Sequence, residues 1–467
     1  MSTNIRPEGA PVPHAPADGG TGTVRDPERI PHRGRKLFAA ASPLWADNNE
    51  GSILTTLAPI IISELGLAAS ALGLLTSVSK FISIFFGPFW AWAARKTNRK
   101  GVLVWTTVAV ALLTAAAGLA QNFAQLLIVW SFTAVFIASS LPIVSEITAD
   151  LFDEKSRGKA NGNTYGILAL VGSLLGPLIG QLANVPNGWR IGFFASGVVG
   201  LLVATWVAIG FKDPGVGATE PALRDLTAAE RNAHARLTWK KVGQLIRIPS
   251  FALMLGQRLL SGHLLISTFG ILFLVNTYGF RTATAAVVTL PFGLGYLAGT
   301  FFGGLITDVL NRRRPNSGRV MVLQVAQFAF GFIAILGTQF SWGSIGIFAV
   351  FWALMGLCQG INPGVNRPIV MAVVPPELRG AAFALMLSVF EALAFVIYNL
   401  AAGFLADAIG LQNVFLWIPG ILMLVNGVYV TLLYRTYPRD VAKLAAQLEE
   451  VRTGSLAAQA GDAHGPS

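Results

Sequence analysis

Charged residues and cysteine are both scarce in this chain, and each scarcity excludes a class of protein. Only 12% of the 467 residues are Asp, Glu, Lys or Arg, whereas 53% are hydrophobic. A soluble globule of this length needs far more charged surface, so the composition predicts an integral membrane protein. The single cysteine, Cys358, lies inside an apolar run and excludes a disulfide framework within the chain.

Sequence signatures of common enzymes are also missing. The chain contains no phosphate-binding G-x-x-x-x-G-K-[ST], no H-E-x-x-H and no group of Cys and His at metal-ligand spacing. We therefore expect neither an enzyme nor an ATP-driven pump, and no cofactor or metal. Residues 1–37 are rich in Pro, Gly and charge and lack the apolar core of a signal peptide, so they are predicted to form a disordered cytoplasmic tail.

Twelve apolar runs are long enough to cross a bilayer, since a spanning helix needs about 20 mostly apolar residues. They cover residues 38–63, 70–93, 102–120, 123–150, 162–183, 190–211, 251–276, 284–308, 320–339, 343–372, 381–406 and 411–434. A long polar stretch at 212–250 divides them six and six. The predicted fold is an all-α membrane protein with six-helix bundles at 38–211 and 251–434, a cytoplasmic linker between them and a cytoplasmic tail at 435–467.

Lys and Arg are distributed unevenly around these runs. Of the 34 basic residues, 29 lie in the two tails and in the loops after even-numbered runs, and only Arg190 and Arg281 lie in the opposite loops. Cytoplasmic loops of membrane proteins carry this excess of positive charge, so both termini are expected in the cytoplasm. The net charge of +11 therefore reflects membrane topology and does not indicate nucleic-acid binding.

Short stretches in the two halves correspond, as expected of a duplicated transporter. AWAARKTNRK (91–100) follows the second run and GLITDVLNRR (304–313) the eighth, while EKSRGKANG after the fourth run is similar to PELRGAAFA after the tenth. These residues resemble the major facilitator superfamily, which carries G-x-x-x-D-x-x-G-R-R/K after its second span and a weaker copy after its eighth. Gly304, Asp308 and Arg312 match that pattern, whereas Arg95 replaces the Asp of the first copy, in which Arg99 remains.

The resemblance implies a secondary transporter that alternates access to a central cavity between its two halves. It places gating roles on Arg95, Arg99, Asp308 and Arg312. Asp150 and Arg157, after the fourth run, are expected at the same gate or as a capping or solvated pair. Segments such as SELGLAASALGLL and VNRPIVMAVVPPELRG look like the Spinster-type branch, whose members move lipids and other amphipathic molecules. In that branch an acid precedes a proline by nine residues in span 1, as Glu50 precedes Pro59.

Ionisable side chains inside the apolar runs indicate a transport pathway, because a charge at a helix centre costs about 2.5 to 3.5 kcal/mol. Asp47 and Glu50, in the stretch ADNNE, share one helix face, and we expect this stretch to face the cavity. Glu50 is our first candidate for proton coupling, since burial disfavours its charged form and a nearby cation favours it. Asp47, Glu146 and Glu391 are further candidates, with structural ion pairing as the alternative for each.

Fixed cations in the runs predict an anionic substrate. Lys80 lies in the amino-terminal half, and Arg258 and Arg367 lie in the carboxy-terminal half. Arg367 belongs to GINPGVNRPIV, whose prolines either kink the helix or expose backbone carbonyls to a cavity. The other candidate substrate contacts, each with a purely structural alternative, are Asn48, Asn49, His263, Asn362, Asn366 and Tyr398.

Together these features predict a monomeric, proton-coupled transporter of an organic anion or an acidic amphipathic molecule in the cytoplasmic membrane, with protons and membrane lipids as its other partners. GSLLGPLIGQ (172–181) resembles an element of proton antiporters, so export of drugs or lipids is an alternative. An uncoupled facilitator and a transporter-like receptor are further alternatives. The Arg95 substitution slightly favours the receptor.

Overall fold

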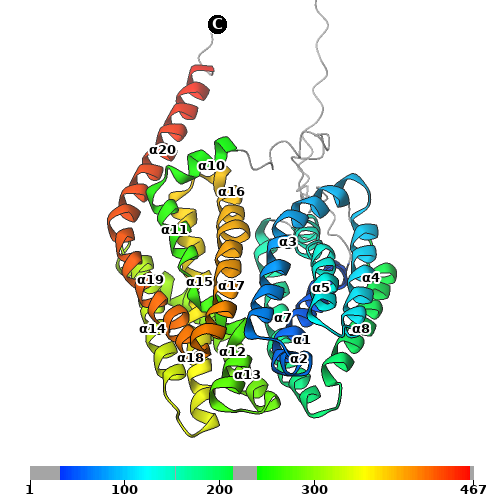
Figure 1. Cartoon of the computed structure of the whole chain (residues 1–467). Coiled ribbons are helices and arrows are strands. Elements are labelled where there is room, and N and C mark those ends of the chain that lie inside the picture. Colours follow the sequence, from blue (N-terminus) through cyan, green and yellow to red (C-terminus); the bar gives the residue numbers. More distant parts are fainter. Residues whose placement is uncertain (1–31, 153, 214–238, 463–467) are drawn as a thin grey trace, which may run out of the picture.

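The computed structural model describes residues 32–152, 154–213 and 239–462, and their regular structure is entirely helical (Figure 1). The amino-terminal bundle consists of α1 (Arg33–Thr56), α2 (Ala58–Leu65), α3 (Ala69–Lys96), α4 (Arg99–Ala117), α5 (Phe123–Ile137), α6 (Ser140–Leu151), α7 (Glu154–Gln181) and α8 (Gly188–Gly210). Most of the predicted amino-terminal tail lies outside the described residues. The last residues of this tail are described and are helical, since α1 begins at Arg33, five residues before the predicted span.

The carboxy-terminal bundle follows the short helix α10 (Trp239–Ile246). It consists of α11 (Pro249–Leu259), α12 (Ile266–Tyr278), α13 (Thr282–Arg313), α14 (Gly318–Gln339), α15 (Ile345–Val373), α16 (Arg379–Phe383), α17 (Glu391–Ile409), α18 (Leu411–Phe415), α19 (Met423–Tyr429) and α20 (Leu433–Asp462). Two π-helical segments, Ala384–Phe390 and Leu416–Leu422, join α16 to α17 and α18 to α19. The helix α20 continues through most of the predicted carboxy-terminal tail.

The twelve-helix prediction is confirmed, although one span has an unusual form. Within the part of the chain that is described, eleven helical segments are long and apolar enough to cross a membrane. The remaining crossing is α1 with α2, which are separated at Leu57, two residues before Pro59. Pro59 explains the break, because a proline fits at the first turn of a helix but interrupts the hydrogen-bond ladder before it. The ADNNE stretch makes α1 too polar to count among the eleven apolar segments.

The two bundles meet chiefly at two helix crossings, α3 with α17 and α7 with α13, and α12 also contacts α1 and α2. A Cβ atom on Gly73 of α3 would lie 2.4 Å from the carbonyl oxygen of Asn399 in α17. On the other side, a Cβ on Gly180 of α7 would lie 2.4 Å from the Cβ of Ala286 in α13. Both distances are too short for a side chain, so glycine permits the close approach of the helices.

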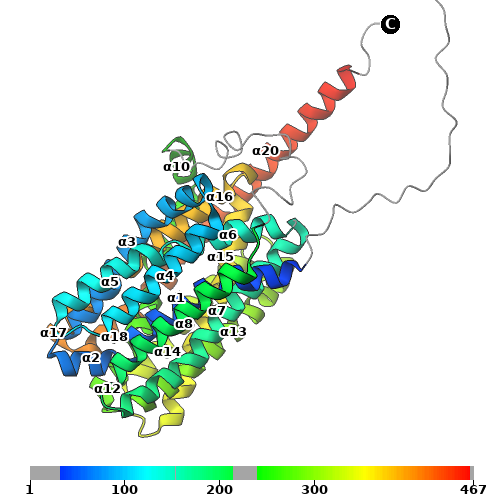
Figure 2. The ribbon, with the colours of Figure 1, turned by 90° about the vertical axis from the view of Figure 1, so that its right-hand side faces the viewer.

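Hydrogen bonds reinforce these crossings at the end of the molecule where α2, α12 and α18 lie (Figures 1 and 2). Asp407, near the end of α17, accepts hydrogen bonds from the backbone amides of Ala69, at 2.9 Å, and Ser70, at 3.2 Å. Arg281 donates to the side-chain oxygen of Asn184 at 2.7 Å. The helices α10 and α16 and the far end of α20 lie at the opposite end of the molecule (Figure 1).

Candidate transport site

The two acids of ADNNE are buried inside the amino-terminal bundle. The exposed fraction is 7% for Asp47 and 1% for Glu50. A Cβ on Gly200 of α8 would lie 3.8 Å from Oε1 of Glu50, and the Thr114 hydroxyl of α4 lies beside the same carboxyl. Oδ2 of Asp47 and Oε2 of Glu50 have no hydrogen-bond partner among the described residues. The structure therefore contains two adjacent carboxyl groups without a cation beside their free oxygens.

We expect the ADNNE stretch to face a cavity, which stays a prediction, and the structure gives its side chains different surroundings. An α-helix turns by about 100° per residue, so neighbouring side chains point to different sides of α1. Asn48 is exposed and points toward α7, where a Cβ on Gly172 would lie 2.9 Å from its amide nitrogen. Asn49 donates to the hydroxyl of Ser196 in α8 at 3.3 Å. The two acids are buried among helices of their own bundle, Asn49 is half-buried, and Asn48 is the exposed one of the four.

A second group of charges lies where α3 meets the carboxy-terminal bundle. Arg258, at the end of α11, forms an ion pair with Glu391, the first residue of α17. The Lys80 ammonium of α3 lies 5.9 Å from the ring centroid of Phe395 and within electrostatic reach of Glu391. Arg258 is only 7% exposed, and its Nε and Nη1 atoms have no partner in the described ranges. The carboxylate and both cations thus come from three different helices.

Tyr296 and Arg367 extend this group within the carboxy-terminal bundle. Tyr296 of α13 lies within electrostatic reach of Glu391, Arg258 and Arg367, and Arg367 of α15 is exposed. Sequence reasoning missed Tyr296, because nothing in its apolar run distinguishes it from a core aromatic residue. We call Lys80, Arg258, Tyr296, Arg367 and Glu391 the central charge cluster.

A break in the helix positions Arg258. The chain leaves helical geometry after Leu259, and a Cβ on Gly262 would lie 2.1 Å from the carbonyl oxygen of Ile418, so only glycine fits there. The Tyr398 hydroxyl donates to the carbonyl oxygen of Leu259, and Asn426 donates to that of Leu260 at 3.1 Å. These side chains satisfy carbonyls that the broken helix leaves free. Tyr398 is predicted to contact substrate, and in the structure its hydroxyl binds the Leu259 carbonyl.

Three other predicted substrate contacts are buried within the carboxy-terminal bundle. His263 packs edge-to-face against Phe330, with 5.9 Å between the ring centroids. Asn362 accepts a hydrogen bond from Gln327 at 2.9 Å, and Asn366 is 4% exposed. All three side chains are buried within their own bundle, and a contact of any of them with substrate stays a prediction.

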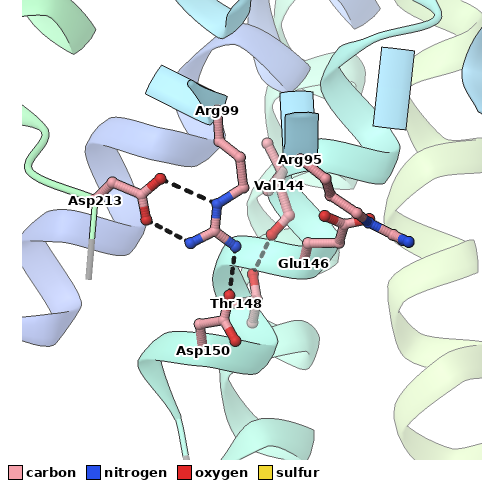
Figure 3. Close-up of polar contacts among 7 residues, drawn as sticks. All are labelled: Arg95, Arg99, Val144, Glu146, Thr148, Asp150 and Asp213. Atoms are coloured by element: carbon pink, nitrogen blue, oxygen red, sulfur yellow. Dashed lines mark hydrogen bonds and ion pairs between the residues drawn. The ribbon is translucent and has the colours of Figure 1, made fainter. Parts of the chain in front are cut away.

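Predicted gate residues of the amino-terminal half form ion pairs with acids of α6, and one of these acids, Glu146, is also a candidate for proton coupling (Figure 3). Arg95 of α3 binds Glu146 of α6, with Nε 2.8 Å from Oε1. Arg99, 3% exposed at the start of α4, binds Asp150 of α6 and Asp213 just after α8, where its Nε lies 3.0 Å from Oδ2. All of these groups belong to one bundle, so they fasten its helices to one another. Sequence reasoning missed Asp213, which follows the sixth run without any motif.

The corresponding residues of the carboxy-terminal half are less constrained. Asp308 and Arg312 are exposed near the end of α13. Arg157 lies in α7, but its side chain is outside the described residues. A gating role for these three residues stays a prediction.

Two helical bundles that meet at glycine crossings, with ionisable groups buried inside and between them, define a polytopic membrane transporter. The family model of the Major Facilitator Superfamily matches residues 47–342 and 292–459. The chain belongs to this family. It is 24% identical over 398 residues to the uncharacterized MFS-type transporter YtbD of Bacillus subtilis, a match that covers 85% of this chain and 94% of that protein.

Other similarities are shorter or more distant. The multidrug resistance protein MdtG of Proteus mirabilis is 31% identical over 153 residues, which cover 32% of this chain and 38% of that protein. A bacterial homologue of the human lysosomal transporter Spinster, crystallised in an inward-facing and unoccupied conformation, superposes with a TM-score of 0.68 at 19% identity, covering 89% of this chain and 98% of that one. A D-xylose-proton symporter superposes with a TM-score of 0.65 at 13% identity, covering 85% and 97%. At these identities the two structures show the shared fold.

Proposed function

We propose that the protein is a proton-coupled transporter of an organic anion or of an amphipathic molecule with an acidic group, working by alternating access. The observation that carries this proposal is the central charge cluster, in which Lys80 and Arg258 lie around one carboxylate, Glu391, and Arg367 lies within electrostatic reach of Tyr296 in the same cluster. Excess positive charge around one site attracts an anion and penalises a cationic ligand. The cluster spans both bundles, so a ligand bound there contacts both moving parts.

Proton coupling is assigned to Glu50, with Asp47 as its neighbour. An ionised carboxylate that is buried without a partner costs several kcal/mol, and a bound proton removes this cost. Both acids have a buried oxygen without a hydrogen bond in the described part of the chain, and both lie on the same face of α1. This pair can therefore gain and lose a proton as the access of water to it changes.

The arrangement of the bundles fits one state of the transport cycle. With the basic end in the cytoplasm, as the charge distribution predicts, the glycine crossings and the Asp407 and Arg281 bonds hold the outer end closed. Release of these contacts would open the protein outward. Both termini would then lie in the cytoplasm, and the protein would act as a monomer in the cytoplasmic membrane.

The test begins with a thermal-shift screen of the purified protein against metabolites, lipids and drugs, because a ligand at a hundredfold excess over Kd stabilises the native state by about 2.7 kcal/mol. Arg258→Ala and Arg367→Ala are expected to weaken binding of acidic hits and to spare neutral ones. Arg439→Ala is the matched control, since Arg439 is exposed on α20, away from the cluster. Unchanged affinity of acidic hits in both cluster variants would rule out the proposal.

A second candidate function is export of drugs, favoured by the similarity to MdtG. The two functions differ in the direction of coupling. Proteoliposomes loaded with a pH-sensitive dye distinguish them: protons that move together with the substrate support cotransport, and protons that move against it support export by exchange.

A further inference from the structure

Arg258 binds Glu391 through one of the three nitrogen atoms of its guanidinium group. Nη2 contacts the Glu391 carboxylate, whereas Nε and Nη1 are buried and have no acceptor in the described ranges. A guanidinium group matches carboxylate and phosphate groups in geometry and binds them through two nitrogen atoms. Since an unsatisfied buried donor is costly, the free nitrogens of Arg258 form a binding position for a further oxyanion.

The same position is reached from the other bundle. Lys80 of α3 lies within electrostatic reach of Glu391 and above the ring of Phe395. The two helices are in direct contact beside it, because the Ser77 hydroxyl of α3 donates to the carbonyl oxygen of Val396 in α17 at 3.1 Å. An oxyanion between Lys80 and Arg258 would thus be bound by both bundles.

Several ionisable groups from other helices surround Glu391. Arg258 from α11 pairs with it, Lys80 from α3 and Tyr296 from α13 lie within its electrostatic reach, and Arg367 from α15 lies within reach of Tyr296. His263, in the 3₁₀ turn Gly262–Leu265, lies near Arg258, and Tyr398 lies two turns along α17 and binds the Leu259 carbonyl. Among these charged groups Glu391 is the sole acid.

We propose that Glu391 is the counter-ion of Arg258 in the ligand-free transporter. When a substrate oxyanion binds Arg258, it displaces the Glu391 carboxylate, which then takes up a proton. This inference rests on the proposed anion-transport function and adds to the coupling site proposed at Glu50 a second proton site, at which proton uptake is linked to anion binding. The oxyanion brings a second negative charge beside Glu391. Protonation of Glu391 removes the repulsion between the two and keeps the net charge of the site constant when a monoanion binds. By thermodynamic linkage, the proton and the anion each raise the affinity for the other by the same factor. They therefore travel in the same direction.

The test uses octanoate and octyl phosphate as oxyanion probes and octanamide as the neutral probe of similar shape. Binding to the full-length protein in nanodiscs is measured by calorimetry in buffers with different ionisation enthalpies, which gives both the affinity and the number of protons taken up. We expect the wild-type protein to bind the anions and to take up as much as one proton per anion. Binding should tighten as the pH falls.

Glu391→Gln removes the charge while keeping the shape of the side chain. It should bind the anions about tenfold more tightly, with no dependence on pH and no proton uptake. Glu391→Asp keeps the acid and should retain proton uptake, and its thermal unfolding shows whether the position tolerates change. Proton uptake that persists in Glu391→Gln, or weaker anion binding in that variant, would overturn the inference while leaving anion transport intact.

Failure of the proposed function looks different. In that case octanamide binds as well as the anions, or Arg258→Ala binds octanoate and octyl phosphate with wild-type affinity. Glu50→Gln separates the two carboxyl sites, because it should abolish accumulation driven by a pH gradient while leaving proton uptake on anion binding in place. Loss of this uptake in Glu50→Gln together with normal uptake in Glu391→Gln would overturn the role of Glu391.

Discussion

Replacing Gly73 with alanine is expected to open the end of the molecule at which the two bundles are joined. A Cβ atom at this position would lie 2.4 Å from the carbonyl oxygen of Asn399 and 3.2 Å from the Cα atom of Gly403. Both atoms belong to the backbone of α17 and cannot rotate away, so the helices must separate by roughly 1 Å to reach ordinary contact. Overpacking of this kind costs about 1 to 3 kcal/mol.

Because this cost falls on the closed state alone, it should shift the equilibrium toward the open outer end by about 5- to 150-fold. Spin labels on Gln121→Cys and Ser341→Cys, exposed in loops of the two bundles, would report the shift as longer distances in pulsed EPR, with Cys358→Ala as background. Gly87→Ala is the matched control, because its Cβ would meet its nearest neighbour at 3.7 Å. If Gly73→Ala and Gly87→Ala gave the same distance distribution, the crossing would not be what holds the bundles together.

Three further predictions follow from other contacts. Asp407→Asn weakens the carboxylate cap on α3 by about 1 kcal/mol, so it should lengthen the same label distances, and unchanged distances would contradict the role of this bond. Arg99→Ala removes the cation that binds Asp150 and Asp213 and should lower the free energy of unfolding by about 3 kcal/mol, measured as a lower Tm in detergent. A Tm equal to that of Arg439→Ala would show that these ion pairs do not stabilise the fold. Glu50→Gln should abolish accumulation driven by a pH gradient in proteoliposomes while the protein stays folded, and full accumulation in this variant would exclude Glu50 as the coupling group.

The membrane class, the number of spans and the predicted orientation follow from local properties of the chain. A run of apolar residues crosses a bilayer because its backbone must satisfy its own hydrogen bonds, and this requirement can be read from length and composition. The ionisable residues inside such runs, including Lys80, Arg258 and Glu391, are visible in the same way. Sequence alone therefore singled out these residues as candidates for transport, but not how they are paired.

The partners depended on contacts between residues that are far apart in the chain. Glu391 meets Arg258 across 133 positions, and Arg99 meets Asp213 across 114. Helical rotation likewise decided that Glu50 is buried within its bundle while Asn48 is exposed beside α7. Sequence spacing specifies which residues share a helix face, but only the packing of the other helices determines what that face meets, because burial and charge pairing are properties of the assembled bundle.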